Sequence, residues 1–189
     1  MFNRDILNEL KKWAANPDRK PLILRGARQV GKTTVIDLFS KNFDQYIYLN
    51  LEKDEQREIF ENKYPFPDLL TTLFVYAKKK RNGGKTLIFI DEIQNSPKAI
   101  AVLRYFYEEA NDLFVVAAGS LLESILNRNI SFPVGRVEYM ALRPCSFREF
   151  LIATNNDQLV EILDKSEVPL FLHSQYISLF NKYATIGGM

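Results

Sequence analysis

Two glycines and a lysine followed by two threonines stand in one short run, GARQVGKTT at positions 26–34. Its first eight residues fit the pattern G-x-x-x-x-G-K-[ST], in which consecutive main-chain amides surround phosphate groups. In such a loop the lysine contacts the β- and γ-phosphates and the next hydroxyl binds Mg²⁺. The candidate nucleotide-binding residues are therefore Gly26, Ala27, Arg28, Gln29, Val30, Gly31, Lys32, Thr33 and Thr34.

Two carboxylates, Asp91 and Glu92, end the apolar run TLIFI and supply what this loop needs on its metal side. Asp91 can hold Mg²⁺ together with Thr33, through water, and Glu92 can orient or deprotonate a water that attacks the γ-phosphate. Glu92 also has a plainer interpretation, as an acid at a helix start or a solvated charge. The pair favours hydrolysis over phosphoryl transfer, so we expect a nucleoside-triphosphatase with Glu92 and Lys32 as catalytic residues.

Ser120 and Arg136 are further candidate catalytic groups, each with an equally good structural interpretation. Ser120 ends a predicted strand and can help to hold the attacking water, but with Glu123 it also fits a capping box for the next helix. Arg136 can neutralise charge on the nucleotide of a neighbouring subunit. The alternative for Arg136 is an ion pair with Glu138 or another carboxylate.

The remaining polar features indicate chemistry less clearly. Four cations at positions 78–81 are compatible with nucleic-acid binding, but at a helix end they also complement the dipole, and we favour that interpretation. Arg28 faces either solvent or phosphate. His173 and Cys145 have no metal-ligand neighbours in the sequence, so no zinc site is predicted.

Strands and helices must alternate to position these groups. Apolar and β-branched runs predict strands at 21–25, 46–51, 86–91, 113–120 and 135–142. Helical spacing predicts an amphipathic helix over 2–15 and helical structure over 53–81 that is interrupted near YPFP. This alternation indicates a parallel α/β sheet, with the glycine loop between a strand and a helix.

Capping signals and the change of pattern near residue 153 indicate the domain organisation. Ser96, with Pro97 after it, starts one helix, and Ser146 with Glu149 fits a capping box for another. Beyond these the pattern is wholly helical. We expect a nucleotide-binding domain over 1–153 with an N-terminal amphipathic helix, and a helical segment over 154–189 that begins a truncated second domain.

The composition is that of a soluble globular protein, with 47% hydrophobic and 25% charged residues. A net charge of +2 is too small to argue for nucleic acid by itself. The single cysteine excludes an internal disulfide and favours a reducing compartment. No apolar run is long enough to cross a bilayer, and the charged N-terminus lacks a signal core. We expect a cytoplasmic protein.

In four runs the sequence resembles a group of prokaryotic AAA-type P-loop ATPases that carry an ATP-binding core and a C-terminal domain of unassigned function. The runs are GARQVGKTT, TLIFIDEIQ, VVAAGS and GRVEYMALRPCSFREFL, and the resemblance covers residues 1 to about 153. It implies an α/β fold, the three-layer α/β/α sandwich of P-loop NTPases, with a five-stranded parallel sheet ordered 5-1-4-3-2. It also implies ATP and Mg²⁺ as ligands and the roles given above to Lys32, Thr33, Asp91, Glu92, Ser120 and Arg136.

Other classes of nucleotide-binding protein fit less well. A GTPase recognises guanine with N-K-x-D, and neither NKYP at 62–65 nor NKYA at 181–184 supplies the aspartate. A small-molecule kinase needs an acceptor pocket and an arginine-rich lid, and we locate neither. The leading hypothesis is an ATPase module whose nucleotide state drives an attached domain or partner. The alternative is a non-catalytic ATP switch that binds DNA or protein through the helical C-terminal part; a homo-oligomer stays open.

Overall fold

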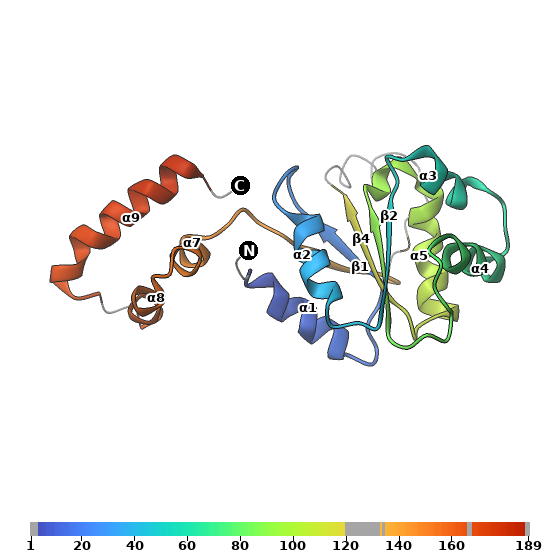
Figure 1. Cartoon of the computed structure of the whole chain (residues 1–189), viewed down its shortest axis with the longest axis horizontal. Helices are drawn as coiled ribbons and strands as arrows, with labels where there is room; N and C mark the ends of the chain where they lie inside the picture. Colours follow the sequence, from blue (N-terminus) through green and yellow to red (C-terminus); the bar gives the residue numbers. More distant parts are fainter. Residues whose placement is uncertain (1–3, 120–132, 134, 166–167, 188–189) are drawn as a thin grey trace.

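The computed structural model describes residues 4–119, 133, 135–165 and 168–187. At its centre lies a parallel sheet of five strands in the order β2-β3-β4-β1-β5 (Figure 1). The strands are β1 (Leu22–Arg25), β2 (Gln45–Asn50), β3 (Thr86–Asp91), β4 (Phe114–Gly119) and β5 (Glu138–Ala141). The predicted order 5-1-4-3-2 is confirmed, since it is this order read from the other edge. The last strand, predicted over 135–142, is shorter than expected.

The register of the sheet brings the carboxyl ends of its strands to the same end of the sheet. Arg25, the last residue of β1, pairs with Gly119 of β4 and Ala141 of β5. Asn50 pairs in the same way with Asp91, so β2 and β3 also end together. The loops that follow these strands therefore leave the sheet on the same side.

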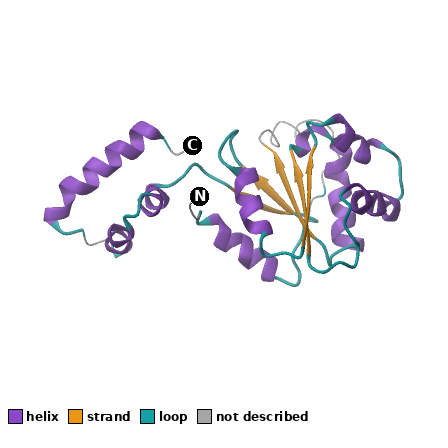
Figure 2. Ribbon diagram, viewed as in Figure 1, coloured by secondary structure: helices purple, strands orange, loops and turns teal. Residues whose placement is uncertain are grey.

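Helices cover both faces of the sheet, which confirms the predicted three-layer sandwich (Figure 2). On one face lie α1 (Ile6–Ala15) and α2 (Lys32–Ser40); on the other lie α3 (Asp54–Glu61), α4 (Phe66–Tyr76) and α5 (Pro97–Glu109). Every residue of β3 and β4 is buried. Strands covered on both faces need apolar side chains at successive positions, which explains the continuous apolar runs in the sequence.

The amphipathic helix predicted near the N-terminus is confirmed as α1, which begins at Ile6; the described residues 4 and 5 precede it. Its buried residues are Ile6, Leu7, Leu10 and Trp13, which share one face at helical spacing. The indole Nε1 of Trp13 donates a hydrogen bond of 2.9 Å to the carbonyl of Lys20. This bond fixes the end of α1 beside the chain that enters β1.

The helical structure predicted over 53–81 is interrupted as expected, but its second helix ends earlier, at Tyr76. Lys78 has a φ of 54°, which helical geometry does not allow. The four cations at 78–81 thus follow the helix instead of forming its last turn. One of them, Arg81, forms a bidentate ion pair with Asp112, with N–O distances of 2.5 and 2.7 Å. That hydrogen-bonded pair raises the pKa of Arg81.

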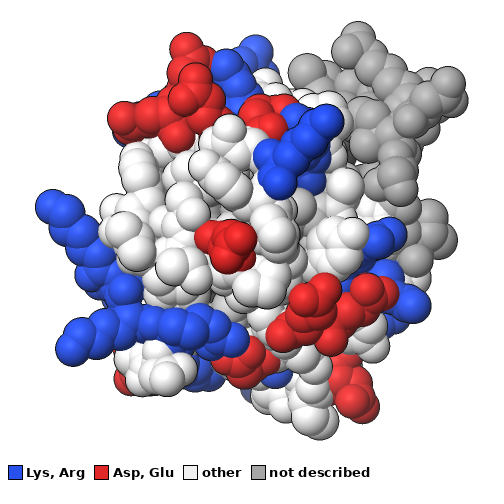
Figure 3. Space-filling view, turned by 90° about the vertical axis from the view of Figure 1, so that its right-hand side faces the viewer, with Lys and Arg blue, Asp and Glu red and all other residues white. Residues whose placement is uncertain are grey.

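The side of the molecule that carries α4 mixes charges of both signs (Figure 3). Uncharged side chains occupy much of its middle, and Lys, Arg, Asp and Glu side chains lie mostly around the edge. Exposed apolar groups on and near α4 include Val75, which is 70% accessible, and Tyr64. No continuous basic field is visible on this face, in keeping with the small net charge.

In the described part of the chain after β5, three helices lie to one side of the sheet (Figure 1). They are α7 (Phe147–Ala153), α8 (Asp157–Asp164) and α9 (His173–Ile186), with the 3₁₀ turn η2 (Leu170–Leu172) before α9. They share a small apolar core of Leu151, Leu159, Val160 and Tyr176. The capping box of Ser146 and Glu149 at the start of α7 is confirmed. The domain division at residues 153 and 154 stays a prediction. No described helix is long and apolar enough to span a membrane.

Ser96 offers a test of how α5 is held. Ser96 stands between the 3₁₀ turn η1 (Ile93–Asn95) and α5. Its buried hydroxyl accepts a hydrogen bond from the amide of Ala99 at 3.1 Å and donates one to Glu61 Oε1 at 2.7 Å. We expect Ser96→Ala to lower the free energy of unfolding by about 1–2 kcal/mol, because the helix loses its N-cap. Urea unfolding measures this loss.

A matched control for Ser96→Ala is Ser40→Ala at the end of α2. The Ser40 hydroxyl only donates to the carbonyl of Asp37 on the same helix, at 2.8 Å. Its removal should change the unfolding free energy by less than about 0.5 kcal/mol. Equal losses in the two variants would contradict the capping role of Ser96.

Candidate functional site

The loop of residues 26–31 joins β1 to α2 and takes its shape from left-handed backbone positions. Gly31, directly before α2, has a φ of 94°, and Gln29 has a φ of 61°. A side chain at Gly31 would be strained, so the second glycine of the motif is required by the backbone. Val30 lies between them with 3% of its surface exposed and anchors the loop in the core. The loop thus turns sharply into the amino end of α2.

A cavity of about 530 Å³ lies where this loop meets the end of β3. It is lined by Arg28, Gln29, Gly31, Lys32, Thr33, Thr34, Asp91 and Glu92. Cations and the positive end of a helix form one side, and two carboxylates form the other. Such a site suits a polyanion that is accompanied by a cation. Most of the predicted binding residues and the predicted acidic pair therefore share one cavity.

The side chain of Lys32 lies within the loop, with only 6% of the residue exposed. Its Nζ donates to the carbonyls of Gly26 at 2.9 Å and Ala27 at 2.8 Å. Burial lowers the pKa of Lys32, while the negative charges of Glu92 and Asp91 act in the opposite direction. The ammonium is thus held at the cavity by two neutral acceptors, which a charged oxygen can replace.

Thr33 and Asp91, the two predicted metal ligands, are in direct contact. Thr33 Oγ1 donates to Asp91 Oδ2 at 2.7 Å, and the amide of Glu92 donates to Asp91 Oδ1 at 3.0 Å. Burial raises the pKa of Asp91, against the effect of these two hydrogen bonds and of Lys32.

One hydroxyl and one carboxylate suit Mg²⁺, which takes its other ligands from phosphate and water. The described residues contain no group of three His, Cys, Asp or Glu side chains able to hold a metal ion.

Glu92 has a backbone conformation unusual for its residue type. Its φ is 53°, in the left-handed region, where a non-glycine residue is held only by its surroundings. The side chain makes no capping hydrogen bond to the turn η1 that follows. Its carboxylate instead accepts a hydrogen bond from the side-chain amide of Gln94. No local motif singles out Gln94 as a partner of Glu92, because the contact depends on how this turn folds.

Tyr48 of β2 is a second site residue that sequence reasoning missed. Its hydroxyl donates to Asp91 Oδ2 at 3.4 Å, and its ring stacks on Phe89 with the centroids 5.5 Å apart. Burial and then the charge of Asp91 raise the pKa of Tyr48 to about 12, so the hydroxyl remains a donor at neutral pH. The contact arises from the pairing of β2 with β3, which no local motif specifies.

Several predicted site residues do not line the cavity. Gly26 and Ala27 contribute carbonyls to Lys32, and Val30 is buried beneath the loop. Ser120 lies outside the described residues.

Arg136 lies near the amino ends of the strands, at the end of the sheet opposite the cavity. It precedes β5, whose first residue Glu138 pairs with Leu22, the first residue of β1. Its Nε lies 2.8 Å from Glu108, so the ion-pair partner is this residue rather than Glu138, which accepts from the amide of Lys20. A role for Arg136 in the site of a neighbouring subunit stays a prediction.

Comparison with protein families finds a match over most of the chain. A family model described as an AAA domain matches residues 18–151. This range contains the glycine loop, Lys32, Thr33, Asp91 and Glu92. A search of curated proteins finds no match.

Comparison with solved structures finds similar folds at low sequence identity. Drosophila ORC bound to DNA aligns with a TM-score of 0.56 and 15% identity over 95% of this chain and 56% of that one. C. elegans PCH-2 aligns with a TM-score of 0.51 and 14% identity over 93% and 52%. The chain thus spans about half the length of these structures. At such identities the similarity establishes the fold alone.

Gly26 provides a test of how the loop is packed. A Cβ at this position would lie 2.6 Å from the carbonyl oxygen of Leu142 and 3.0 Å from Val30 Cγ1. We expect Gly26→Ala to lower the free energy of unfolding by about 1–3 kcal/mol, because backbone must move to make room. Thermal unfolding without added nucleotide measures the loss. Ala27→Ser adds one atom at the exposed neighbouring position and should leave the unfolding temperature nearly unchanged; equal effects would contradict the packing argument.

Proposed function

Because this chain belongs to the AAA domain family, we propose that it binds ATP together with Mg²⁺ at the loop of residues 26–34 and hydrolyses the ATP. One observation carries the proposal: Lys32 and Thr33 line one side of a cavity of about 530 Å³, and Asp91 and Glu92 line the other. The family match supports nucleotide binding, and the arrangement of these four side chains supports hydrolysis.

In the proposed complex the loop amides and Lys32 bind the phosphates. The ammonium group exchanges the carbonyls of Gly26 and Ala27 for phosphate oxygens, which bear full charge and form stronger hydrogen bonds. The amino end of α2 adds the favourable field of its dipole. Thr33 and Asp91 would hold the Mg²⁺, which when bound neutralises charge on the phosphate oxygens.

Glu92 is the proposed general base. Water attacks the γ-phosphorus, the bond from that phosphorus to the β,γ-bridging oxygen breaks, and the carboxylate takes the proton of the water. The amide of Gln94 orients this carboxylate. We include Ser120 as a residue that helps to hold the water, and Arg136 as a group that leaves Glu108 to enter the site of a neighbouring subunit. The latter role requires a homo-oligomer.

The proposed output of the nucleotide cycle is a conformational change in the helical segment after residue 153 or in a bound partner. DNA and protein both remain candidate partners through that segment. The segment between β5 and α7 supports a link between the loop and these helices. The amide of its Leu142 donates to the carbonyl of Arg25, the residue directly before the loop, at 2.8 Å.

Lys32→Ala tests the proposed binding. We expect the dissociation constant for Mg-ATP to rise roughly 10- to 100-fold, because a hydrogen bond to a charged group contributes about 1.5–3 kcal/mol. Titration calorimetry measures the affinity. Wild-type protein should also melt at a higher temperature in millimolar Mg-ATP, since the ligand binds only the folded form. The control is Lys41→Ala at the exposed far end of α2, which should bind ATP as the wild type does. Equal affinities in all three proteins would contradict the assignment.

Glu92→Gln tests the proposed hydrolysis. We expect kcat to fall by about 10²- to 10⁴-fold while the affinity for ATP survives, because the amide keeps the shape of the carboxylate but cannot take a proton. Phosphate release measures turnover. Glu58→Gln makes the same change on the exposed surface of α3 and should leave kcat unaltered.

Negligible turnover in both wild type and Glu92→Gln would favour the alternative of a non-catalytic ATP switch. That reading would be strengthened by tight DNA binding that weakens steeply with salt.

A further inference from the structure

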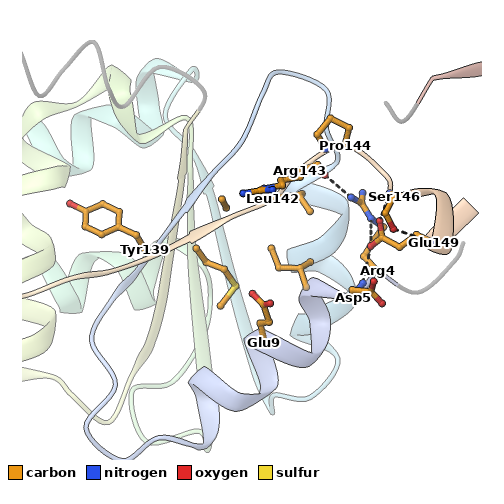
Figure 4. Close-up of a pocket in the computed structure, with 12 residues that line it drawn as sticks. Arg4, Asp5, Glu9, Tyr139, Leu142, Arg143, Pro144, Ser146 and Glu149 are labelled. Atoms are coloured by element: carbon orange, nitrogen blue, oxygen red, sulfur yellow. Dashed lines mark hydrogen bonds and ion pairs between the residues drawn. The ribbon is translucent and has the colours of Figure 1, made fainter. Parts of the chain in front are cut away.

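A buried ion pair joins the start of the chain to α7 (Figure 4). Arg4, just before α1, places Nε 2.9 Å from Glu149 Oε1, with side chains 10% and 6% exposed. The other ion pairs among the described residues have at least one partner whose side chain is 38% exposed or more. A buried pair needs further hydrogen bonds to offset its desolvation. Its other partners therefore indicate what it holds.

The guanidinium of Arg4 reaches three separate parts of the chain. Besides Glu149, it donates from Nη1 to the carbonyl of Val30 at 3.4 Å and from Nη2 to the carbonyl of Arg143 at 2.7 Å. Val30 belongs to the glycine loop, and Arg143 lies in residues 142–146, which we call the linker, between β5 and α7. One side chain thus connects the loop, the linker and α7.

Glu149 is fixed in turn by hydrogen bonds to both of its oxygens. Oε1 also accepts from the amide of Asp5 at 2.8 Å, and Oε2 accepts from the amide of Ser146 at 2.8 Å. Burial acts to raise the pKa of Glu149, but these hydrogen bonds and that of Arg4 outweigh it and hold the pKa below its ordinary value. The carboxylate is therefore ionised at neutral pH and holds the guanidinium in one orientation.

The linker itself contacts the first residue of the loop, Gly26. The carbonyl oxygen of Leu142 would lie 2.6 Å from a Cβ at Gly26, so the two backbones are in close contact there. The first residue of the loop thus packs on the linker, and Val30, near its end, is bound by Arg4. These two contacts hold the loop near both of its ends, and neither Arg4 nor Leu142 lines the cavity.

The contact to Val30 determines which way one amide of the loop points. In a planar trans peptide the carbonyl and the following N–H point in opposite directions. Because the Val30 carbonyl is directed to Arg4, the N–H of Gly31 is directed away from Arg4. Gly31 lines the cavity and has a φ of 94°. Glycine adopts positive and negative φ about equally well, so this conformation needs an external contact to keep it fixed.

We propose that Arg4 is a positioning residue for nucleotide binding, and that Glu149 of α7 orients it. Arg4 fixes the Val30–Gly31 peptide so that its N–H is available to phosphate, and α7 contributes to this through Glu149. The inference rests on the proposed function, since its effect is on ATP affinity. Lysine cannot replace Arg4, because an ammonium is a point donor and the planar guanidinium reaches three acceptors at once.

The test compares Arg4→Lys and Glu149→Gln with Arg148→Met in the full chain. Arg148 of α7 pairs with Asp5 and with Asp164, each at 3.1 Å, so it also joins α7 to the segment before α1, and no ion pair or hydrogen bond of it to the described loop residues is found. Glu149→Gln keeps an acceptor for the capping box but removes the charge opposite Arg4. We expect both test variants to raise the dissociation constant and the KM for Mg-ATP about tenfold with little change in kcat. Arg148→Met should change neither by more than about twofold.

Unfolding temperatures without nucleotide separate positioning from a purely structural role. Lowered stability with unchanged ATP affinity in folded Arg4→Lys and Glu149→Gln would overturn the inference, as would equal weakening by Arg148→Met. If Arg4→Lys does not fold, an unchanged ATP affinity in Glu149→Gln is enough by itself to overturn the inference. Failure of wild-type protein to bind ATP would instead overturn the proposed function, and the inference with it, so the two failures are distinguishable.

Discussion

The site depends on the parallel alignment of the five strands. In a parallel sheet every strand ends at the same edge, so groups that follow different strands meet there. The glycine loop follows β1, and Asp91 with Glu92 ends β3, although β4 lies between these strands. The cavity exists because this geometry brings a cationic loop opposite an acidic strand end. Each helix layer serves the same end by burying one face of the strands that carry the site.

Much of the fold and part of the site could be predicted because their signals are local. Continuous apolar runs identify strands covered on both faces, and the Ser96 and Ser146 caps act over three residues. The spacing of the glycine loop identifies Lys32 and Thr33 by itself, and Asp91 follows from its place at a strand end. The fold predictions are confirmed because each concerns one stretch of chain and its immediate neighbours. Lys32, Thr33 and Asp91 do line one cavity, and their roles in it stay predictions.

The remainder of the site depends on contacts between distant parts of the sequence. Tyr48 reaches Asp91 only through the register of β2 on β3, and Gln94 reaches Glu92 only through a strained turn. Arg136 illustrates the same limit, since its partner is Glu108 from α5 and not the nearby Glu138. Element boundaries shifted for a related reason: the cations after Tyr76 have good helix propensity, yet the backbone turns at Lys78.

If the loop binds ATP as proposed, the contact between Arg4 and Glu149 would give the helices after β5 a physical route to the nucleotide. Thermodynamic linkage is reciprocal. If the attachment of α7 increases the affinity of the loop for ATP, bound ATP must stabilise the attachment of α7 by the same free energy. Through α7 that proposed effect would reach α8 and α9, because Leu151 packs with Leu159 and Tyr176 in one apolar cluster. Loss of the γ-phosphate would then weaken the attachment, and the helical segment would gain freedom of movement relative to the sheet. A conformational output therefore needs no contact between these helices and the nucleotide itself.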